Sequence, residues 1–213
     1  MIRRSNIPAV SKTMKTANGK TGRPITFDKE AALEAAMLLF WERGYEGTSM
    51  ADLTQAMGLN PSSIYAAFGD KHALFQLAVE RYMEKRAIYA GKALEEPTLE
   101  KFIRAIFSNT VAFLTTPGHP PSCMTLVASV GCGVDAAPAR ELMTEIRKQN
   151  EAAIRERLLK ARKSGELPKG INVNDYTRYL SSILAGLSIQ AANGSTKDEL
   201  RRTTKMALRH LGY

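Results

Sequence analysis

The stretch TSMADLTQAMGLNPSSIYAAFGDK, residues 48–71, contains the signals of two short helices joined by a tight turn. Thr48 and Ser49 are residues that cap helix N-termini, and Asp52 places a carboxylate in the positive first turn. The apolar side chains that follow recur on one side of a helix, at Met50, Leu53 and Met57.

The second helix of this stretch has its own start and stop signals. Gly58 supplies the backbone freedom that ends the first helix, and Asn60 followed by Pro61 begins the second. Ile64 and Phe68 lie one turn apart and are expected to face inward. The pattern predicts a helix-turn-helix, which points to DNA.

The order of these elements resembles the DNA-binding domain of the TetR family of bacterial transcriptional regulators, from Phe27 to about Met83. An alanine-rich first helix precedes the motif and a long helix follows it, and the matching positions are Phe40, Gly44, Tyr45, Thr48, Gly58, Ile64, Tyr65, Phe68 and Lys71. A helical core without function would share the periodicity, but not this order of glycine, cap, turn and tyrosine. The resemblance implies an all-α protein, in which a three-helix DNA-binding domain is joined by a long helix to a C-terminal helical ligand-binding and dimerisation domain.

Charge divides the 213 residues unevenly. The net charge is +9, yet residues 27–71 are acidic overall, and residues 1–26 hold only basic charges. We expect residues 1–26 to be a flexible basic arm, 27–71 the DNA-binding domain and 72–213 the effector-binding and dimerisation domain. Gly22-Arg23-Pro24 resembles the core of arms that place an arginine in the minor groove, although a solubilising tail would have the same composition.

The DNA-facing surface is expected to be small and mostly uncharged. The expected DNA-binding residues are Arg23, Thr48, Ser49, Asn60, Pro61, Ser62, Ser63, Tyr65, Ala66 and Lys71. The resemblance implies that Tyr65 and Lys71 contact the sugar-phosphate backbone, with the small residues of the second helix against the bases. Because this helix offers no bidentate base contact, we expect shape readout to contribute to specificity.

Helical patterns continue to the C-terminus, over residues 98–114, about 122–130, 138–164, 175–192 and 196–211. The last two resemble the dimerising pair of the family, with an expected interface at Leu180, Leu184, Leu187 and Ala191. The alternative is a monomer that uses this surface as its own core. The sequence has no apolar run of membrane-spanning length and no secretory signal, so we expect a cytoplasmic protein.

Catalytic signals are missing from the sequence. No phosphate-binding loop, nucleophile elbow or zinc-ligand spacing occurs, so we expect no enzyme activity, no cofactor and no metal site. A small-molecule effector of unknown identity is expected among the middle helices, with pocket candidates Phe102, Ile106, Phe107, Cys123, Met124, Val127, Tyr179 and Ile183. Each of these residues also fits an ordinary core position.

The sequence therefore predicts a homodimeric repressor that binds an inverted-repeat operator and is released by a small-molecule effector. Two alternatives stay open. In the first, Cys123 and Cys132, near His119 and Met124, act as a thiol-based redox or electrophile sensor, or as a metal sensor, although both cysteines also fit as small buried hydrophobes. In the second, the protein associates with DNA nonspecifically through its arm.

Overall fold

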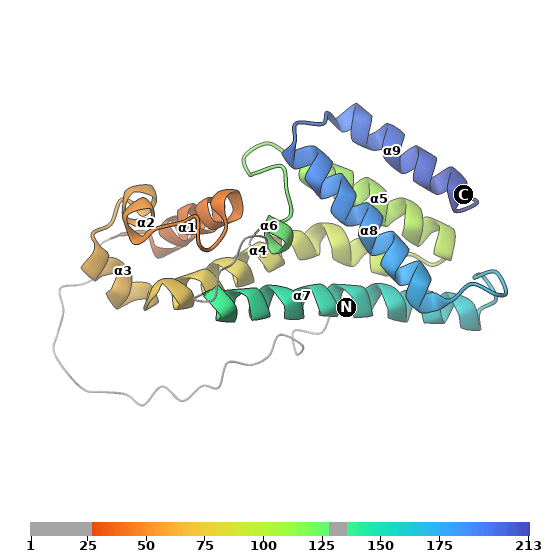
Figure 1. Cartoon of the computed structure of the whole chain (residues 1–213), viewed down its shortest axis with the longest axis horizontal. Coiled ribbons are helices and arrows are strands. Elements are labelled where there is room, and N and C mark those ends of the chain that lie inside the picture. Colours follow the sequence, from red (N-terminus) through yellow and green to blue (C-terminus); the bar gives the residue numbers. More distant parts are fainter. Residues whose placement is uncertain (1–26, 128–135) are drawn as a thin grey trace.

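The computed structural model describes residues 27–127 and 136–213, and all regular structure in these two ranges is helical (Figure 1). The helices are α1 (Lys29–Arg43), α2 (Met50–Met57), α3 (Pro61–Phe68), α4 (Lys71–Leu94), α5 (Leu99–Leu114), α6 (Met124–Val127), α7 (Ala137–Lys163), α8 (Val173–Ala192) and α9 (Lys197–His210). The all-α fold predicted from the sequence is confirmed.

Side-chain caps begin the helices of the N-terminal part. The Asp28 carboxylate accepts from the first free amides of α1, and Ser49 forms a reciprocal capping box with Asp52 at the start of α2. Asn60 caps α3 and Asp70 caps α4 in the same way. Each cap satisfies amides that have no partner inside the helix, which is why the helices start at these positions.

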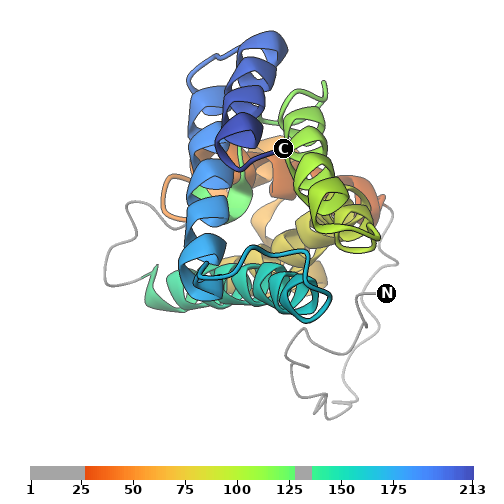
Figure 2. The same cartoon turned by 90° about the vertical axis from the view of Figure 1, so that its right-hand side faces the viewer.

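Helices α1, α2 and α3 gather at one end of the molecule, and the long helix α4 leads from them into the remaining helices (Figure 1). The end view shows α5, α7, α8 and α9 grouped in front of them (Figure 2). Helix α4 packs against α1 with its first half and also against α5 and α7. Helix α4 continues through Gly91 to Leu94, ahead of Pro97.

Aromatic side chains fill the core of the N-terminal part. Phe40 of α1 and Phe75 of α4 are fully buried, with ring centroids 5.1 Å apart, and Tyr45 completes the group at 5.0 Å from Phe75. These rings hold the helix-turn-helix on the beginning of α4.

Ion pairs on the outside join the same two helices. Glu34 of α1 accepts from Arg81 at 2.6 Å and also from Lys85, both on α4, and Glu30 pairs with Arg81 as well. Partial burial alone would raise the pKa of Glu34, but the hydrogen bonds from Lys85 and Arg81 outweigh it and lower the pKa. The stabilisation is therefore present above the carboxyl's ordinary pKa and is lost as the pH falls through the lowered value.

Trp41 connects the N-terminal part to the C-terminal helices. Its indole Nε1 donates to the Ser122 carbonyl oxygen at 3.0 Å, and its ring stacks on Phe113 of α5 and on His119. Tyr82 of α4 meets the same ring edge-on at 4.8 Å. The side chain is buried, so one residue of α1 contacts α4, α5 and the segment before α6.

Two of the helix predictions for the C-terminal part need correction. Of the expected helix over about 122–130, the described residues contain only the short α6, and 128–135 lie outside them. Helix α8 begins at Val173 rather than 175, because the Asn172 side chain caps it. None of the described helices is both long and apolar enough to cross a lipid bilayer.

The interface predicted on α8 is placed on the wrong side of that helix. Leu180, Leu187 and Ala191 are buried inside the protomer, at most 2% exposed, and Leu184 lines a cavity described below. The three buried side chains have no surface left for a second subunit, so the expected interface is corrected at these positions. Leu184 is half-buried, and its place in a dimer interface stays a prediction. The apolar stripe read from the sequence is the inward face of α8.

We expect Phe75→Ala to destabilise the fold by about 3–5 kcal/mol, because it removes a fully buried ring and leaves a cavity between α1 and α4. Chemical denaturation followed by circular dichroism measures the loss. Ile88→Ala is the matched control on the same helix, since Ile88 is 62% exposed and should change stability by less than about 0.5 kcal/mol. Equal effects of the two substitutions would contradict this account of the core.

Candidate nucleic-acid interface and ligand cavity

Helix α3 presents one face of small and polar side chains to solvent. Pro61, Ser62 and Ala66 are exposed, Ser63 is half-buried, and the Tyr65 ring is 51% exposed. The opposite face holds the buried Ile64 and Phe68, which fix the helix on the core. This exposed face contains the base-facing positions predicted from the sequence, and their contacts with DNA stay a prediction.

Asn60 and Ser49 act first as caps. The Asn60 Oδ1 accepts from the Ser63 amide at 2.8 Å and from the Ser62 hydroxyl at 2.7 Å. At the start of α2, the Ser49 hydroxyl and amide both donate to the Asp52 carboxylate. Both capping residues are exposed.

Thr48 is a correction to the predicted DNA-binding set. Its side chain is fully buried, and its hydroxyl donates to the Gly44 carbonyl oxygen at 2.8 Å. Thr48 therefore holds the turn between α1 and α2 and presents nothing to DNA. Ser49 caps α2 in its place, and Arg23 lies outside the described residues.

Lys71, at the first position of α4, is held beside the motif by an aromatic ring. Its Nζ lies 4.4 Å from the centre of the Tyr45 ring. Partial burial lowers the pKa of Lys71, while Glu46 and Asp52 act in the opposite direction. The cation–π contact orients the ammonium group at the edge of the α3 face.

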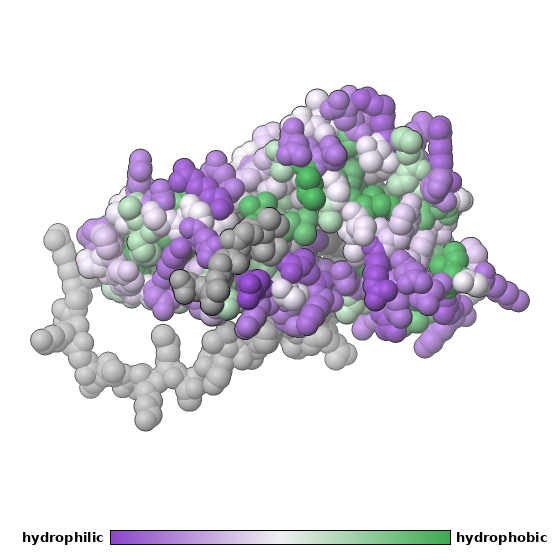
Figure 3. Space-filling view, in the orientation of Figure 1, coloured by the Kyte–Doolittle hydropathy of each residue, from purple (hydrophilic) through white to green (hydrophobic). Residues whose placement is uncertain are grey.

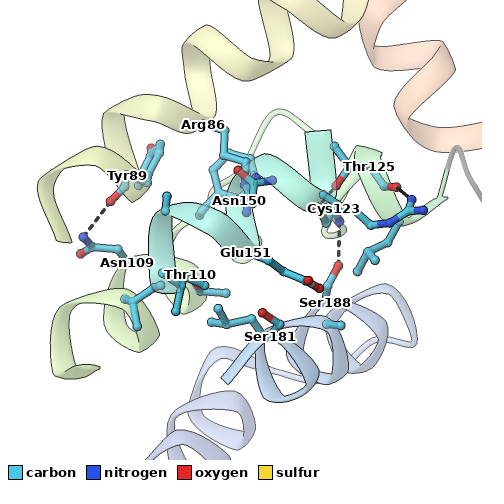
Figure 4. A pocket seen from close by; sticks show the side chains of 18 of the residues that line it. Arg86, Tyr89, Asn109, Thr110, Cys123, Thr125, Asn150, Glu151, Ser181 and Ser188 are labelled. Carbon is cyan, nitrogen blue, oxygen red and sulfur yellow. Dashed lines mark hydrogen bonds between the residues drawn. The ribbon is translucent and has the colours of Figure 1, made fainter. Parts of the chain in front are cut away.

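A cavity of about 240 Å³ lies between α4, α5, α7, α8 and the segment that begins at Cys123 (Figure 4). Most of the lining surface is apolar, and the polar members come from the four long helices and from α6: Arg86, Tyr89, Asn109, Thr110, Thr125, Arg147, Asn150, Glu151, Ser181 and Ser188. A cavity with mainly apolar walls and polar groups placed among them is the usual form of a small-molecule site.

The cavity lining differs from the set of pocket candidates named from the sequence. Ile106 and Cys123 line it. Phe102, Phe107 and Met124 are fully buried core side chains, and Tyr179 is 41% exposed on the outer face of α8. Val127 and Ile183 are half-buried outside the lining. The missed polar residues of α4 and α7, such as Arg86 and Asn150, sit among charged positions, where the sequence gives no sign of a cavity.

Cys123 lies in the cavity wall among polar groups. Its Sγ is 3.0 Å from the Thr125 hydroxyl oxygen and 3.4 Å from that of Tyr82, which donates to it. Its backbone amide donates to the Ser188 hydroxyl at 2.7 Å. Burial alone would raise the pKa of the thiol, but the Arg86 guanidinium and the two hydroxyls outweigh it and lower the pKa.

His119 and Met124, which lie near Cys123 in the sequence, do not form a site with its thiol. Met124 is buried, and the His119 ring lies between Trp41 and Phe113 with Nδ1 3.0 Å from the Pro120 carbonyl oxygen. Within the described ranges, no three His, Cys, Asp or Glu side chains are placed to hold a metal ion. Cys132 lies outside those ranges, so its pairing with Cys123 stays untested.

Comparison with known proteins identifies the class. Residues 32–78 match the model of bacterial regulatory proteins of the tetR family. The HTH-type transcriptional repressor ComR of Escherichia coli (strain K12) is 30% identical over 190 residues, covering 88% of this chain and 90% of ComR. The HTH-type transcriptional repressor BdcR of the same organism is 29% identical over 188 residues, covering 87% of this chain and 90% of BdcR.

A solved structure agrees over most of the chain. A cysteine mutant of the TetR family transcriptional regulator CifR, complexed with double-strand operator DNA, is 32% identical with a TM-score of 0.83, covering 88% of this chain and 98% of CifR. The chain belongs to the TetR family of bacterial regulatory proteins. It is a DNA-binding transcriptional regulator and not an enzyme.

We expect Cys123 to react with iodoacetamide at a lower pH than an ordinary cysteine, because a lowered thiol pKa gives more thiolate, which is the nucleophile. The measurement is the alkylation rate against pH in a Cys132→Ser background. Arg86→Gln should move the half-maximal pH upward, whereas Arg104→Gln on the exposed face of α5 should not. A half-maximal pH that Arg86→Gln leaves unchanged would show that Arg86 does not activate the thiol.

Proposed function

We propose that this protein is a repressor that binds an inverted-repeat operator as a homodimer and is released when a small molecule occupies the cavity. The observation that carries the proposal is that α4 takes part in both sites. Lys71 at its start borders the α3 face, and Tyr82, Arg86 and Tyr89 further along it line the cavity. A ligand that prefers one position of α4 would change the placement of α3.

A second subunit fits the outer face of α8 and α9. Large apolar side chains are exposed there, with Tyr179 at 41%, Ile189 at 56% and Met206 at 70%. Figure 3 shows hydrophobic surface along α8 between hydrophilic areas. Contiguous exposed apolar surface usually marks an interface, and a twofold dimer would present two copies of α3 to two half-sites.

Gel-shift titration tests operator recognition, with the DNA upstream of the protein's own gene and a scrambled duplex of equal length at about 0.15 M salt. We expect preference for the native duplex with two subunits per site. Tyr65→Ala should weaken that binding at least about tenfold without lowering thermal stability, because the ring is exposed and would contact the DNA backbone. Ile88→Ala is the matched control, since it also removes an exposed apolar side chain but lies far along α4.

Deleting residues 1–23 separates the specific from the nonspecific alternative. A repressor that reads its operator through α3 should keep its preference for the native duplex after the deletion, with a smaller salt dependence. If selection from random duplexes also yields no preferred site, and the deletion abolishes binding, the arm-driven nonspecific alternative is correct.

A thiol-based sensor is the second candidate function, and the surroundings of Cys123 favour it. The thiol lies in the cavity wall with a lowered pKa, and its neighbour Ser122 is hydrogen-bonded to Trp41 of α1. Covalent modification of Sγ would therefore occur on the residue next to the contact that joins the DNA-binding part. An oxidant or an electrophile would be the signal in place of a reversible ligand.

Separate Cys123→Ser and Cys132→Ser variants discriminate the two candidates. If the thiol is the sensor, operator release by diamide or N-ethylmaleimide disappears in one of the variants. Release that survives both substitutions removes the thiol candidate and leaves the reversible ligand.

A further inference from the structure

We infer that the cavity takes a small organic acid, whose carboxylate lies against Arg86 and whose largely apolar body fills the space between α5, α7 and α8. The inference rests on the proposed function, because it names the chemical class of the effector. It follows from polar groups of this cavity that have no partner among residues 27–127 and 136–213.

Arg86 is a cation that has no carboxylate partner among the described residues. It lies on α4 and lines the cavity, with its side chain directed toward the other lining residues in Figure 4. Within residues 27–127 and 136–213 its guanidinium forms no ion pair and no hydrogen bond, and the charges that act on it are those of Cys123 and Tyr82. Arg86 is half-buried, so part of its hydration is lost, and a carboxylate can compensate by pairing with the guanidinium through two parallel hydrogen bonds.

Two further groups in the same lining have unused hydrogen-bonding capacity. The Ser181 hydroxyl of α8 is buried and has no partner in the described part of the chain. The Asn150 side chain of α7 forms no hydrogen bond there either. Buried polar groups are almost always paired, so an orphaned hydroxyl beside a cavity points to a ligand atom that completes it.

The charge of the lining favours an anion. Its ionic residues in the described ranges are Arg86, Arg147 and Glu151, which leaves one positive charge in excess. Arg147 already has hydrogen-bond partners, because its guanidinium donates to the Thr125 carbonyl oxygen at 3.1 Å and to the Thr144 hydroxyl at 2.9 Å. Arg86 is therefore the group that is free to bind the acid.

The remaining walls set the size and character of the ligand. Apolar side chains such as Ile106, Phe113 and Leu184 also line the cavity. An apolar cavity of about 150 Å³ holds a benzene molecule, so about 240 Å³ admits on the order of ten non-hydrogen atoms. A carboxylate attached to an aromatic ring or a short alkyl chain meets these limits.

Isothermal titration calorimetry with benzoate, phenylacetate and hexanoate, each against its neutral amide, tests the inference. We expect at least one acid to bind at least about tenfold more tightly than its amide, because only the acid forms charge-assisted hydrogen bonds. Arg86→Gln should remove that difference, and Arg104→Gln on the surface of α5 should keep it. Thermal unfolding confirms that each variant is folded, and Arg86→Lys should retain part of the preference because it retains the charge.

Three results would overturn the inference: amides that bind as tightly as acids, an Arg86→Gln variant that keeps the preference, or no binding by any acid up to about 10 mM. The Cys123→Ser variant should bind the acid at least as well, because no thiolate then competes for Arg86. Loss of binding in that variant would contradict a reversible acid ligand.

Operator titration with and without the acid distinguishes this inference from the proposed function. Specific operator binding that no acid alters, together with no acid binding, means that the ligand class is wrong while the repressor stands. Acid binding that depends on Arg86 but leaves operator affinity unchanged means that the ligand class holds and ligand-driven release is wrong.

Discussion

The contact between the N-terminal part and the C-terminal helices depends on the packing of Trp41. This side chain of α1 is buried against Tyr82 of α4, Phe113 of α5 and His119, and its indole nitrogen is satisfied by the Ser122 carbonyl oxygen. A buried indole needs a partner for its N–H, so the segment before α6 must pass this point. The ion pairs of Glu34 then fix the angle between α1 and α4 from outside.

The same segment forms one wall of the cavity. Ser122 is followed by Cys123, whose amide donates to Ser188 of α8 and whose sulfur is held by Thr125. Occupancy of the cavity and the position of α1 are therefore connected through adjacent residues as well as through α4. Closely packed side chains transmit a displacement instead of absorbing it, which gives both a reversible ligand and a modified thiol a physical route to the DNA-binding helices.

Local signals predicted most of the helix-turn-helix, and tertiary packing decided the rest. The caps Asn60 and Ser49 act through amides a few residues away, so the sequence contains them entirely. Leu180 and Leu187 show the limit, because a periodic stripe tells that a helix face is buried but not whether its own chain or a second copy covers it. Thr48 was assigned to the DNA surface and Arg86 was not found for a similar reason. A buried threonine and a cavity arginine cannot be told from exposed ones in the sequence.

Trp41 is the single tryptophan among the 213 residues, and its ring stacks on His119 at a centroid distance of 4.5 Å. Tryptophan fluorescence, excited at the long-wavelength edge of the protein absorbance, therefore comes from one residue. That residue lies where the N-terminal part meets the C-terminal helices. An imidazole in stacking contact quenches indole emission, so the intensity senses the separation of these two rings. The intrinsic fluorescence of Trp41 therefore reports on this junction in real time without an added label.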